Sequence, residues 1–287
     1  MISVVVPAYN EGMVIERCLR AMLEEARPGE LEIVVVCNGC KDDTAARVRK
    51  FGPMVTVIET PEGGKIHALN LGDEAATSFP RFYVDADIEL STAALRDVVA
   101  LLGDDSPILA AAPKAVVDYR DRSLLVRSFY EVWTRLPYFD EGMIGAGVYA
   151  FSRRGRARFD KFPDIIADDA YARLVVAPHE RRCSSGSTFT ITPPTTLRGI
   201  VQIKTRVLAG NYELRRKFPE LVANETTDAA RSLRVIAITP RLWPHAPIYL
   251  GVMAVAKLLA HRKLEQRRER EWNRDETSRA AAARRGG

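Results

Sequence analysis

The chain has 287 residues, of which 47% are hydrophobic and 28% are charged, and its net charge is +5. This composition is typical of an ordinary globular protein and excludes the disordered and fibrous classes. The basic excess is greatest near the C-terminus, where residues 262–275 hold six Lys or Arg against four Asp or Glu. Such a tail attracts nucleic acid, anionic lipid or acidic polymers, but a solvated and partly disordered terminus is the plainer interpretation.

Strand and helix patterns alternate along the first hundred residues. Short apolar runs predict strands at residues 2–6, 31–36, 54–58 and 81–84, and Pro7 is expected to end the first of them. Apolar residues at helical spacing predict helices at residues 11–26, 42–50 and 66–76. Short apolar strands separated by amphipathic helices are typical of parallel strands buried on both faces. We therefore expect an α/β, Rossmann-like, mostly parallel and doubly wound sheet.

Polar residues follow three of the predicted strands. They are residues 7–11 after the first strand, residues 37–43 after the second, and Asp85-Ala86-Asp87 after the fourth. Because parallel sheets bind ligands outside the carboxyl ends of their strands, these three clusters predict a ligand site at one edge of the sheet.

The second half of the chain is less regular. Its patterns predict helices at residues 95–102 and 123–136 and strands at residues 108–112 and 145–151. Residues 246–256 form a clean apolar stretch that is well short of the ~18–20 residues needed to span a bilayer. We expect a C-terminal helical appendage there, which either packs on protein or lies on a membrane surface.

The carboxylates of Asp85 and Asp87 follow the fourth predicted strand directly. At a strand terminus, a turn can bring both side chains toward one ligand. A hard divalent ion prefers such oxygen ligands, and it leaves positions open for the oxygens of a diphosphate. Surface acids with this spacing are common, so it is the position at the sheet edge that favours a metal site.

A second acid pair, Asp168 and Asp169, precedes a predicted helix at residues 171–176. Adjacent acids at a helix start often cap the helix and complement its dipole. The functional alternative is that one carboxylate acts as a general base and takes the proton of an acceptor hydroxyl. The spacing alone leaves both interpretations open.

Two sets of basic residues are candidates for binding phosphate. Lys65 follows two glycines and precedes a helix, where a backbone can approach a phosphate closely. Arg198, Lys204 and Arg206 would offset charge on a leaving diphosphate, although a solvated helix face is the plainer interpretation.

The ordered motifs resemble glycosyltransferase family 2, whose members are inverting enzymes of the GT-A fold. The resemblance rests on residues 5–11, 38–44, 64–70, 85–87, 145–154 and 168–174, and it fades after about Gly210. It implies a GT-A domain over residues 1–230, with a donor half at about 1–105 and an acceptor half at about 106–230. A helical region at 231–265 and a basic, flexible tail at 266–287 would follow.

The resemblance also implies a role for each matching position. Asp87 would be the ligand of a divalent metal, Mn²⁺ or Mg²⁺, and Asp169 would be the catalytic base. Arg206 lies in residues 202–206, which look like a reduced form of the family's Q-x-x-R-W segment. The nucleotide-sugar would be held by Pro7, Tyr9, Glu11, Asn38, Lys65, Asp85 and Arg206.

The chain departs from the family pattern at three places. Cys37-Asn38 replaces an Asp-Asp pair, so an amide carbonyl stands where a carboxylate would read the N3–H of uracil. Asp168 replaces the Glu of a Glu-Asp motif. Val207 stands where polymer-making members often carry a tryptophan, which counts against a processive synthase.

The resemblance therefore implies an inverting, metal-dependent glycosyltransferase that moves a sugar from a nucleoside-diphosphate donor, expected to be UDP-linked, to an acceptor hydroxyl. The acceptor is a small molecule, a lipid-linked molecule or a glycan. A non-catalytic nucleotide-sugar binder remains an alternative. So does a sugar-phosphate nucleotidyltransferase, although that class carries a glycine-rich basic loop after its first strand. No nucleic-acid partner is expected, and the C-terminal helix is a candidate for peripheral membrane contact or for a homodimer.

The cysteine pattern and the first residues bear on the compartment. Cys37 and Cys40 form a lone C-x-x-C with no second pair and no histidine cluster, so neither a structural zinc nor a thioredoxin-like role is expected. The first residues read as a strand and not as a signal peptide. We expect a cytoplasmic protein, with the inner face of the membrane as an alternative location.

Overall fold

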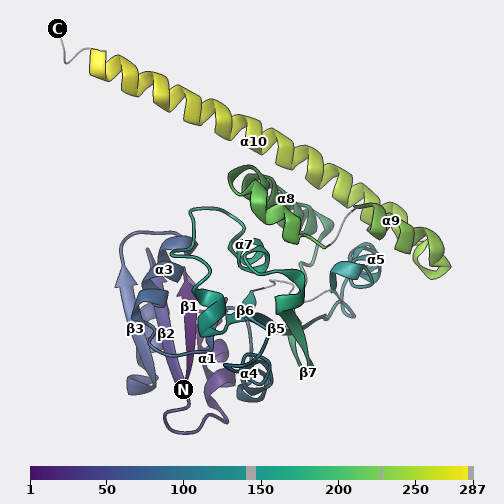
Figure 1. The fold of residues 1–287 in the computed structure, drawn as a ribbon. Coiled ribbons are helices and arrows are strands. Elements are labelled where there is room, and N and C mark those ends of the chain that lie inside the picture. The colour runs from purple at the N-terminus through teal and green to yellow at the C-terminus, as the bar shows by residue number, and fades with distance from the viewer. Residues whose placement is uncertain (140–146, 227–228, 284–287) are drawn as a thin grey trace.

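A seven-stranded mixed sheet forms the centre of the computed structural model, which describes residues 1–139, 147–226 and 229–283 (Figure 1). The strands lie in the order β3-β2-β1-β4-β6-β5-β7. Strand β6 is antiparallel to both β4 and β5, and the other neighbouring pairs are parallel. The prediction of a mostly parallel α/β sheet is confirmed. The strands are β1 (Ile2–Ala8), β2 (Leu31–Asn38), β3 (Val55–Thr60), β4 (Arg81–Val84), β5 (Ala110–Val117), β6 (Val148–Phe151) and β7 (Arg181–Ile191).

Helices cover both faces of the sheet, as a doubly wound fold requires. Alternate residues of β1 enter two different cores, Val4 and Val6 on one face and Val5 on the other. Helices α1, α4 and α5 pack on the first face, and α3 and α7 pack on the second. The helices are α1 (Ile15–Leu23), α2 (Thr44–Arg49), α3 (Lys65–Ala75), α4 (Thr92–Val99), α5 (Leu124–Trp133), α6 (Arg153–Arg156), α7 (Asp168–Leu174), α8 (Leu197–Lys217), α9 (Ala229–Ile238) and α10 (Ala246–Ala283).

Pro7 does not end β1, and that prediction is wrong. The strand continues to Ala8, and Pro7 pairs with Val36 of β2. Ser3 donates its amide toward the β4 side, to the carbonyl of Pro80. Pro7 lies four residues after Ser3, so its backbone nitrogen faces the same side, toward β4. The β1–β4 pairing, however, ends at Val5. Because no ladder partner lies opposite Pro7 on that side, its missing N–H costs no hydrogen bond.

Strand β7 and the helical C-terminus complete the fold. The edge strand β7 carries serines and threonines and pairs with β5 in parallel, with a register shift between Pro113 and Lys114. Helix α10 packs on α8 and α5 and then runs past them (Figure 1), so the expected helical appendage is present. Over the described residues, no helix is both long enough and apolar enough to cross a membrane. The expected strand at residues 145–151 begins at Val148, and residues 145–146 lie outside the described part.

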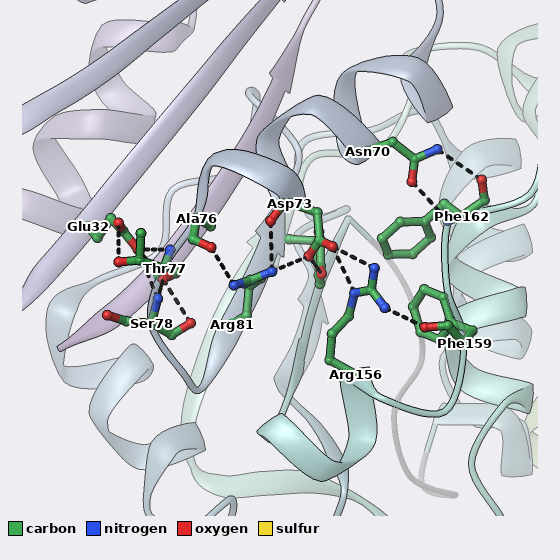
Figure 2. Close-up of polar contacts among 12 residues, drawn as sticks. Glu32, Asn70, Asp73, Ala76, Thr77, Ser78, Arg81, Arg156, Phe159 and Phe162 are labelled. Atoms are coloured by element: carbon green, nitrogen blue, oxygen red, sulfur yellow. Dashed lines mark hydrogen bonds and ion pairs between the residues drawn. The ribbon is translucent and has the colours of Figure 1, made fainter.

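A buried ionic network fixes the C-terminal end of α3 (Figure 2). Asp73 accepts from Arg81 at 2.6 Å through one carboxylate oxygen and from Arg156 at 2.5 Å through the other. The hydroxyl of Tyr83 donates to Asp73 as well. Near the middle of the same helix, the side chain of Asn70 donates to the carbonyl of Phe162 and accepts from its amide. Helix α3 is therefore held against β4 and against the segment before α7.

Candidate functional site

The loops that follow β1 and β2 are tied to each other by their backbone amides. Glu11 donates its amide to the Thr44 hydroxyl at 2.8 Å, and Gly12 donates to Asp42 at 3.0 Å. Lys41 donates its amide to the side chain of Asn10 at 2.8 Å. These bonds fasten the loop after β1 to the loop after β2, and α1 begins at Ile15, four residues after the predicted start at Glu11.

Asn38 joins three parts of this edge. Its side-chain nitrogen donates to the carbonyl of Ala8 at 2.9 Å, and its side-chain oxygen accepts from the amide of Gly64 at 2.9 Å. The side chain is buried. Both polar atoms of the side-chain amide are therefore hydrogen-bonded to backbone groups. These bonds connect the ends of β1 and β2 to the residue before Lys65. The expectation that Asn38 reads a base stays a prediction.

Lys65 lies between two carboxylates from different halves of the chain. Its Nζ is 2.8 Å from Oδ1 of Asp85 and 3.2 Å from Oδ2 of Asp168. Although burial opposes the charge, these two carboxylates hold the pKa of Lys65 above its usual range. The lysine at the start of α3 therefore connects the end of β4 with the start of α7.

Asp87 remains without an ion pair among the described residues, and its surroundings are acidic. Partial desolvation and the charge of Asp85 raise the pKa of Asp87, while the charges of Lys65 and Arg206 act in the opposite direction. Partial burial and the charges of Asp87 and Asp85 also raise the pKa of Glu11. These three carboxylates therefore share one negative field.

The second acid pair occupies the first turn of α7. Asp168 is buried and accepts from the hydroxyl of Tyr149 at 3.3 Å through Oδ2, the oxygen that also faces Lys65. Asp169 is half-buried and accepts from the amide of Ala170 at 2.7 Å. Burial and the charge of Asp168 raise the pKa of Asp169 to about 7. A carboxylate with that pKa can accept a proton near neutral pH.

A glycine before β6 permits the approach of Asp85 to that strand. Gly147 has a φ of 89°, and its carbonyl accepts from the amide of Asp85 at 2.8 Å. A Cβ at Gly147 would lie 3.1 Å from Oδ2 of Asp85. A larger residue would therefore be strained in its backbone and would crowd this carboxylate.

The remaining predicted residues have different environments. Pro7 is buried within β1, while Tyr9 is 54% exposed beyond its end. Arg206 is exposed on α8 and is close enough to Asp87 for its charge to act on that carboxyl. Lys204 lies 3.5 Å from the ring centre of Trp133. Lys204 is therefore a partner of the aromatic cluster of α5 and is separate from the acid pairs.

The C-x-x-C pair is not arranged for redox chemistry. All four cysteines are free. Burial and the neighbouring Cys40 raise the pKa of Cys37 to about 12, whereas a reactive thiol needs a lowered value. Cys40 donates to the carbonyl of Ala8 at 3.3 Å, so it acts as a small polar residue of the sheet edge.

A metal at this edge would need ligands from outside the chain. Within the described residues, no group of three or more His, Cys, Asp or Glu side chains is arranged to hold a metal ion. Asp87, with the negative field of Asp85 and Glu11, fits a hard divalent ion that takes its other ligands from a diphosphate and water. The residues present therefore suit a metal that arrives with a donor.

Comparison with known proteins identifies the family. The model of glycosyl transferase family 2 matches residues 3–162, which is more than half of the chain. The chain belongs to glycosyl transferase family 2. This assignment confirms the resemblance and places the chain among glycosyltransferases.

Curated relatives match over shorter segments. Glycosyltransferase AglE of Haloferax volcanii is 32% identical over 91 residues, which is 30% of this chain and 30% of that protein. An uncharacterized glycosyltransferase, EpsJ of Bacillus subtilis, is 31% identical over 96 residues, which is 32% of this chain and 28% of that protein. The matches span less than a third of the length of each of these two relatives.

Solved structures share the GT-A fold. The mannosyltransferase PcManGT of Pyrobaculum calidifontis, solved with GDP-Man and Mn²⁺, has a TM-score of 0.60 at 24% identity, covering 92% of this chain and 79% of that one. The glucosyl-3-phosphoglycerate synthase of Mycobacterium tuberculosis, solved with phosphoglyceric acid, has a TM-score of 0.52 at 20% identity, covering 80% and 81%. TarS of S. aureus, solved with UDP, has a TM-score of 0.52 at 15% identity, covering 91% of each chain.

Tyr149 and Gly147 are the residues that the sequence did not single out for the site. Both belong to the glycine-led run before and within β6, whose presence was predicted. Their contacts depend on β6 lying antiparallel beside β4, where Tyr149 pairs with Tyr83. The sequence carries no signal for that pairing.

Proposed function

We propose that this member of glycosyl transferase family 2 moves a sugar from a nucleoside-diphosphate donor to an acceptor hydroxyl with inversion at the anomeric carbon. The shared position of Lys65 carries the proposal. It holds one member of each acid pair, Asp85 and Asp168. Within the described residues, it leaves Asp87 and Asp169 without a cation at ion-pair distance. One free carboxylate then serves the donor, and the other serves the acceptor.

On the donor side, Asp87 would hold a divalent ion, Mn²⁺ or Mg²⁺. Such an ion, when bound, stabilises the negative charge of a leaving diphosphate. The acidic field of Glu11, Asp85 and Asp87 supports this assignment, because carboxyl groups with raised pKa values gain a favourable partner when a cation arrives. Lys65 orients Asp85, which would contact the nucleotide.

On the acceptor side, Asp169 would act as the general base. It takes the proton of the acceptor hydroxyl while the hydroxyl oxygen attacks the anomeric carbon. The bond from that carbon to the diphosphate oxygen breaks on the opposite face. The half-buried setting and a pKa of about 7 support the role, because a base is most effective when its pKa lies near the working pH.

Arg206 would face the leaving diphosphate. It is exposed on α8, and its charge already acts on Asp87. A cation there offsets the charge that develops as the bond to the sugar breaks. Arg206 pairs with no carboxylate among the described residues, so its guanidinium is available for a diphosphate.

For the nucleotide, we propose UDP. The exposed ring of Tyr9 beyond the end of β1 offers a surface for stacking a base. Among proteins of the same fold, TarS binds UDP, and PcManGT binds GDP-Man. The base is therefore the part of the donor that the experiment must decide.

A donor screen with a product analysis tests the proposal. Thermal shifts are measured with UDP-, GDP- and other nucleotide-sugars, each with and without Mn²⁺ or Mg²⁺. The transferred sugar is then examined by NMR for its anomeric configuration. We expect a metal-dependent shift with one nucleotide and an inverted product. Donor binding without transfer or slow donor hydrolysis would instead support the non-catalytic binder. The family match leaves the nucleotidyltransferase alternative without support.

A further inference from the structure

The segment from α9 through the first half of α10 exposes large apolar side chains. Tyr249, Val252, Ala256 and Ala260 of α10 are buried against the body, since α10 packs on α8 and α5. Other large apolar side chains of the segment are exposed. The exposed ones over this segment are Leu233, Ile238, Trp243, Leu250, Val255, Leu258 and Leu259, which we call the outer apolar face.

The charge of this segment is of one sign. Residues 229–264 contain six Lys or Arg and no Asp or Glu. Arg234 and Arg241 are exposed near the α9 end of the outer apolar face, and Lys257 is exposed along α10. Apolar groups flanked only by cations complement a surface that is apolar beneath an anionic layer.

Trp243 lies exposed at the turn between α9 and α10. The residue is 58% exposed, and its indole N–H donates to the carbonyl of Ala237 at 3.2 Å. The polar edge of the ring is therefore already satisfied by the protein, while most of its apolar surface is bare. Tryptophan placed in this way is typical of the boundary between lipid and water.

We propose that the outer apolar face docks on the surface of an anionic lipid bilayer, lying along it without crossing it. The alternative occupant is a second copy of this chain. A twofold dimer would bring the same residues of both copies together. It would therefore bring together two copies of residues 229–264, a segment that carries six cations and no carboxylate. Anionic lipid headgroups remove that repulsion, so the observations favour the bilayer.

Vesicle flotation tests this docking. Full-length protein is mixed with vesicles of phosphatidylglycerol and phosphatidylcholine in equal amounts, or with phosphatidylcholine alone. The protein is expected to float with the anionic vesicles only, to be released as salt rises from about 0.1 M to about 0.5 M, and to show a blue shift of tryptophan fluorescence. The double variant L250E/L258E is expected to lose at least about tenfold in vesicle affinity. Met54→Glu, at an exposed apolar residue outside this face, is expected to bind as the wild type.

Two outcomes would overturn the docking proposal. One is wild-type protein that does not float with anionic vesicles. The other is a dimer, seen by light scattering, that L250E/L258E dissociates. Circular dichroism and thermal melting show whether that variant is folded, and the single variant Trp243→Gln gives a second reading in which lost flotation supports the docking.

A separate observation concerns the hydroxyl of Tyr149. Tyr149 is buried on β6, and its ring stacks on Tyr83 with centroids 5.1 Å apart. The two hydroxyls have different partners. That of Tyr149 donates to Asp168 at 3.3 Å, and that of Tyr83 donates to Asp73 in the network of Figure 2. The Tyr149 phenol therefore contacts the candidate site, and the Tyr83 phenol contacts the structural network around Asp73.

We infer that Tyr149 is a positioning residue that fixes the Asp168 carboxylate beside the general base; this inference rests on the proposed function. The groups that face Asp168 are Lys65 of α3, Asp85 after β4, Tyr149 of β6 and Asp169 of its own helix. The phenol and Lys65 both favour the ionised form of Asp168. Without the phenol, the ionised form of Asp168 is less favoured, so the negative charge that raises the pKa of Asp169 is weaker.

Tyr149→Phe and Tyr83→Phe form a matched pair, since both keep the stacked rings and remove one buried hydroxyl. Tyr149→Phe is expected to lower kcat about tenfold at unchanged donor KM, because the Asp168 carboxylate is no longer held in place, and to move the acid limb of kcat/KM to lower pH. Tyr83→Phe is expected to lower the melting temperature and to leave kcat and the acid limb of kcat/KM unchanged. Equal effects of the two variants on kcat and on the limb would overturn the role of Tyr149. Full activity of Asp169→Asn would instead overturn the proposed function.

Discussion

The end of β4 and the start of α7 carry acid pairs that are built alike, although they lie in different halves of the chain. At each place, one carboxylate pairs with Lys65, namely Asp85 at 2.8 Å and Asp168 at 3.2 Å. The other member, Asp87 or Asp169, has no ion pair among the described residues. One lysine thus distinguishes the two members of each pair. It forms an ion pair with one carboxylate and leaves the neighbouring carboxylate for a ligand or a proton.

The two pairs differ in their exposure to water. Asp87 is exposed, whereas Asp168 is buried and Asp169 is half-buried. An exposed carboxylate can exchange water for a metal at low cost. Asp169 is less accessible to water than Asp87, and its burial together with the charge of Asp168 raises its pKa to about 7. The same side-chain chemistry therefore suits metal binding at one pair and proton transfer at the other.

The largest effect is expected at the free member of the α7 pair. Asp169→Asn removes the base but keeps the size of the side chain, so kcat should fall by about 10²–10⁴. Donor affinity, measured by calorimetry, should remain within about twofold, because Asp169 serves the acceptor. Loss of donor binding together with turnover would mean that Asp169 belongs to the donor side.

The free member of the β4 pair comes next. Asp87→Asn is expected to lower kcat about 10²-fold and to raise the Mn²⁺ concentration needed for half-maximal rate, since a neutral amide holds a divalent ion poorly. Glu89→Gln is the matched control, because Glu89 is exposed and pairs with Arg17 at 3.3 Å. A metal requirement that is unchanged in Asp87→Asn would contradict its assignment as ligand.

Removing the shared lysine should leave both members of each acid pair without an ion pair. Lys65→Met leaves the buried Asp168 carboxylate without its cation, so the free energy of unfolding should fall by about 1–3 kcal/mol in urea titrations. It should also lower kcat about tenfold, because Asp85 and Asp168 are no longer fixed. Lys161→Met, which breaks the exposed pair of Lys161 with Glu74, is expected to change neither quantity.

The pH dependence should follow the α7 pair. Because Asp169 must be ionised to accept a proton, kcat/KM of the wild type should rise about tenfold per pH unit below a pKa near 7 and level off above it. The acid limb of kcat/KM is measured from rates at a series of pH values below and above 7, in buffers of constant ionic strength. A flat profile from acid to neutral pH would show that the base has an ordinary carboxyl pKa.

The smallest effect on activity is expected outside both pairs. Asp73→Asn breaks the buried network with Arg81 and Arg156 and should lower the free energy of unfolding by about 3 kcal/mol. At a temperature where the variant is folded, its kcat/KM should stay within about twofold of the wild type. A changed acid limb in this variant would mean that the network also acts on the site.

The sequence predicted the donor half well because its information is local there. Apolar runs located β1 to β4, and the known behaviour of parallel sheets then brought residues 7–11, 37–43 and 85–87 to one edge. The boundaries shifted where the loops contact each other. Thus α1 begins at Ile15, after the segment in which Glu11 and Gly12 donate their amides to the loop after β2.

The second half depends on contacts between distant segments. Strand β7 was not predicted, because its serines, threonines and glycine form no apolar run, and the strand is defined by its pairing with β5. The bridge from Lys65 to Asp168 joins residues far apart in the chain, and no spacing rule connects them. The family resemblance supplied the proposed role of Asp169, and the structure adds that its neighbour Asp168 is the one that pairs with Lys65.

The division of roles within the α7 pair is the centre of the account, and one matched measurement tests it most directly. Asp168→Asn and Asp169→Asn are compared in the same transfer assay, with donor affinity measured for both. The account predicts that Asp169→Asn loses by far the more turnover at unchanged donor affinity, whereas Asp168→Asn keeps a working base. A greater loss of turnover in Asp168→Asn, with Asp169→Asn close to the wild type, would contradict it.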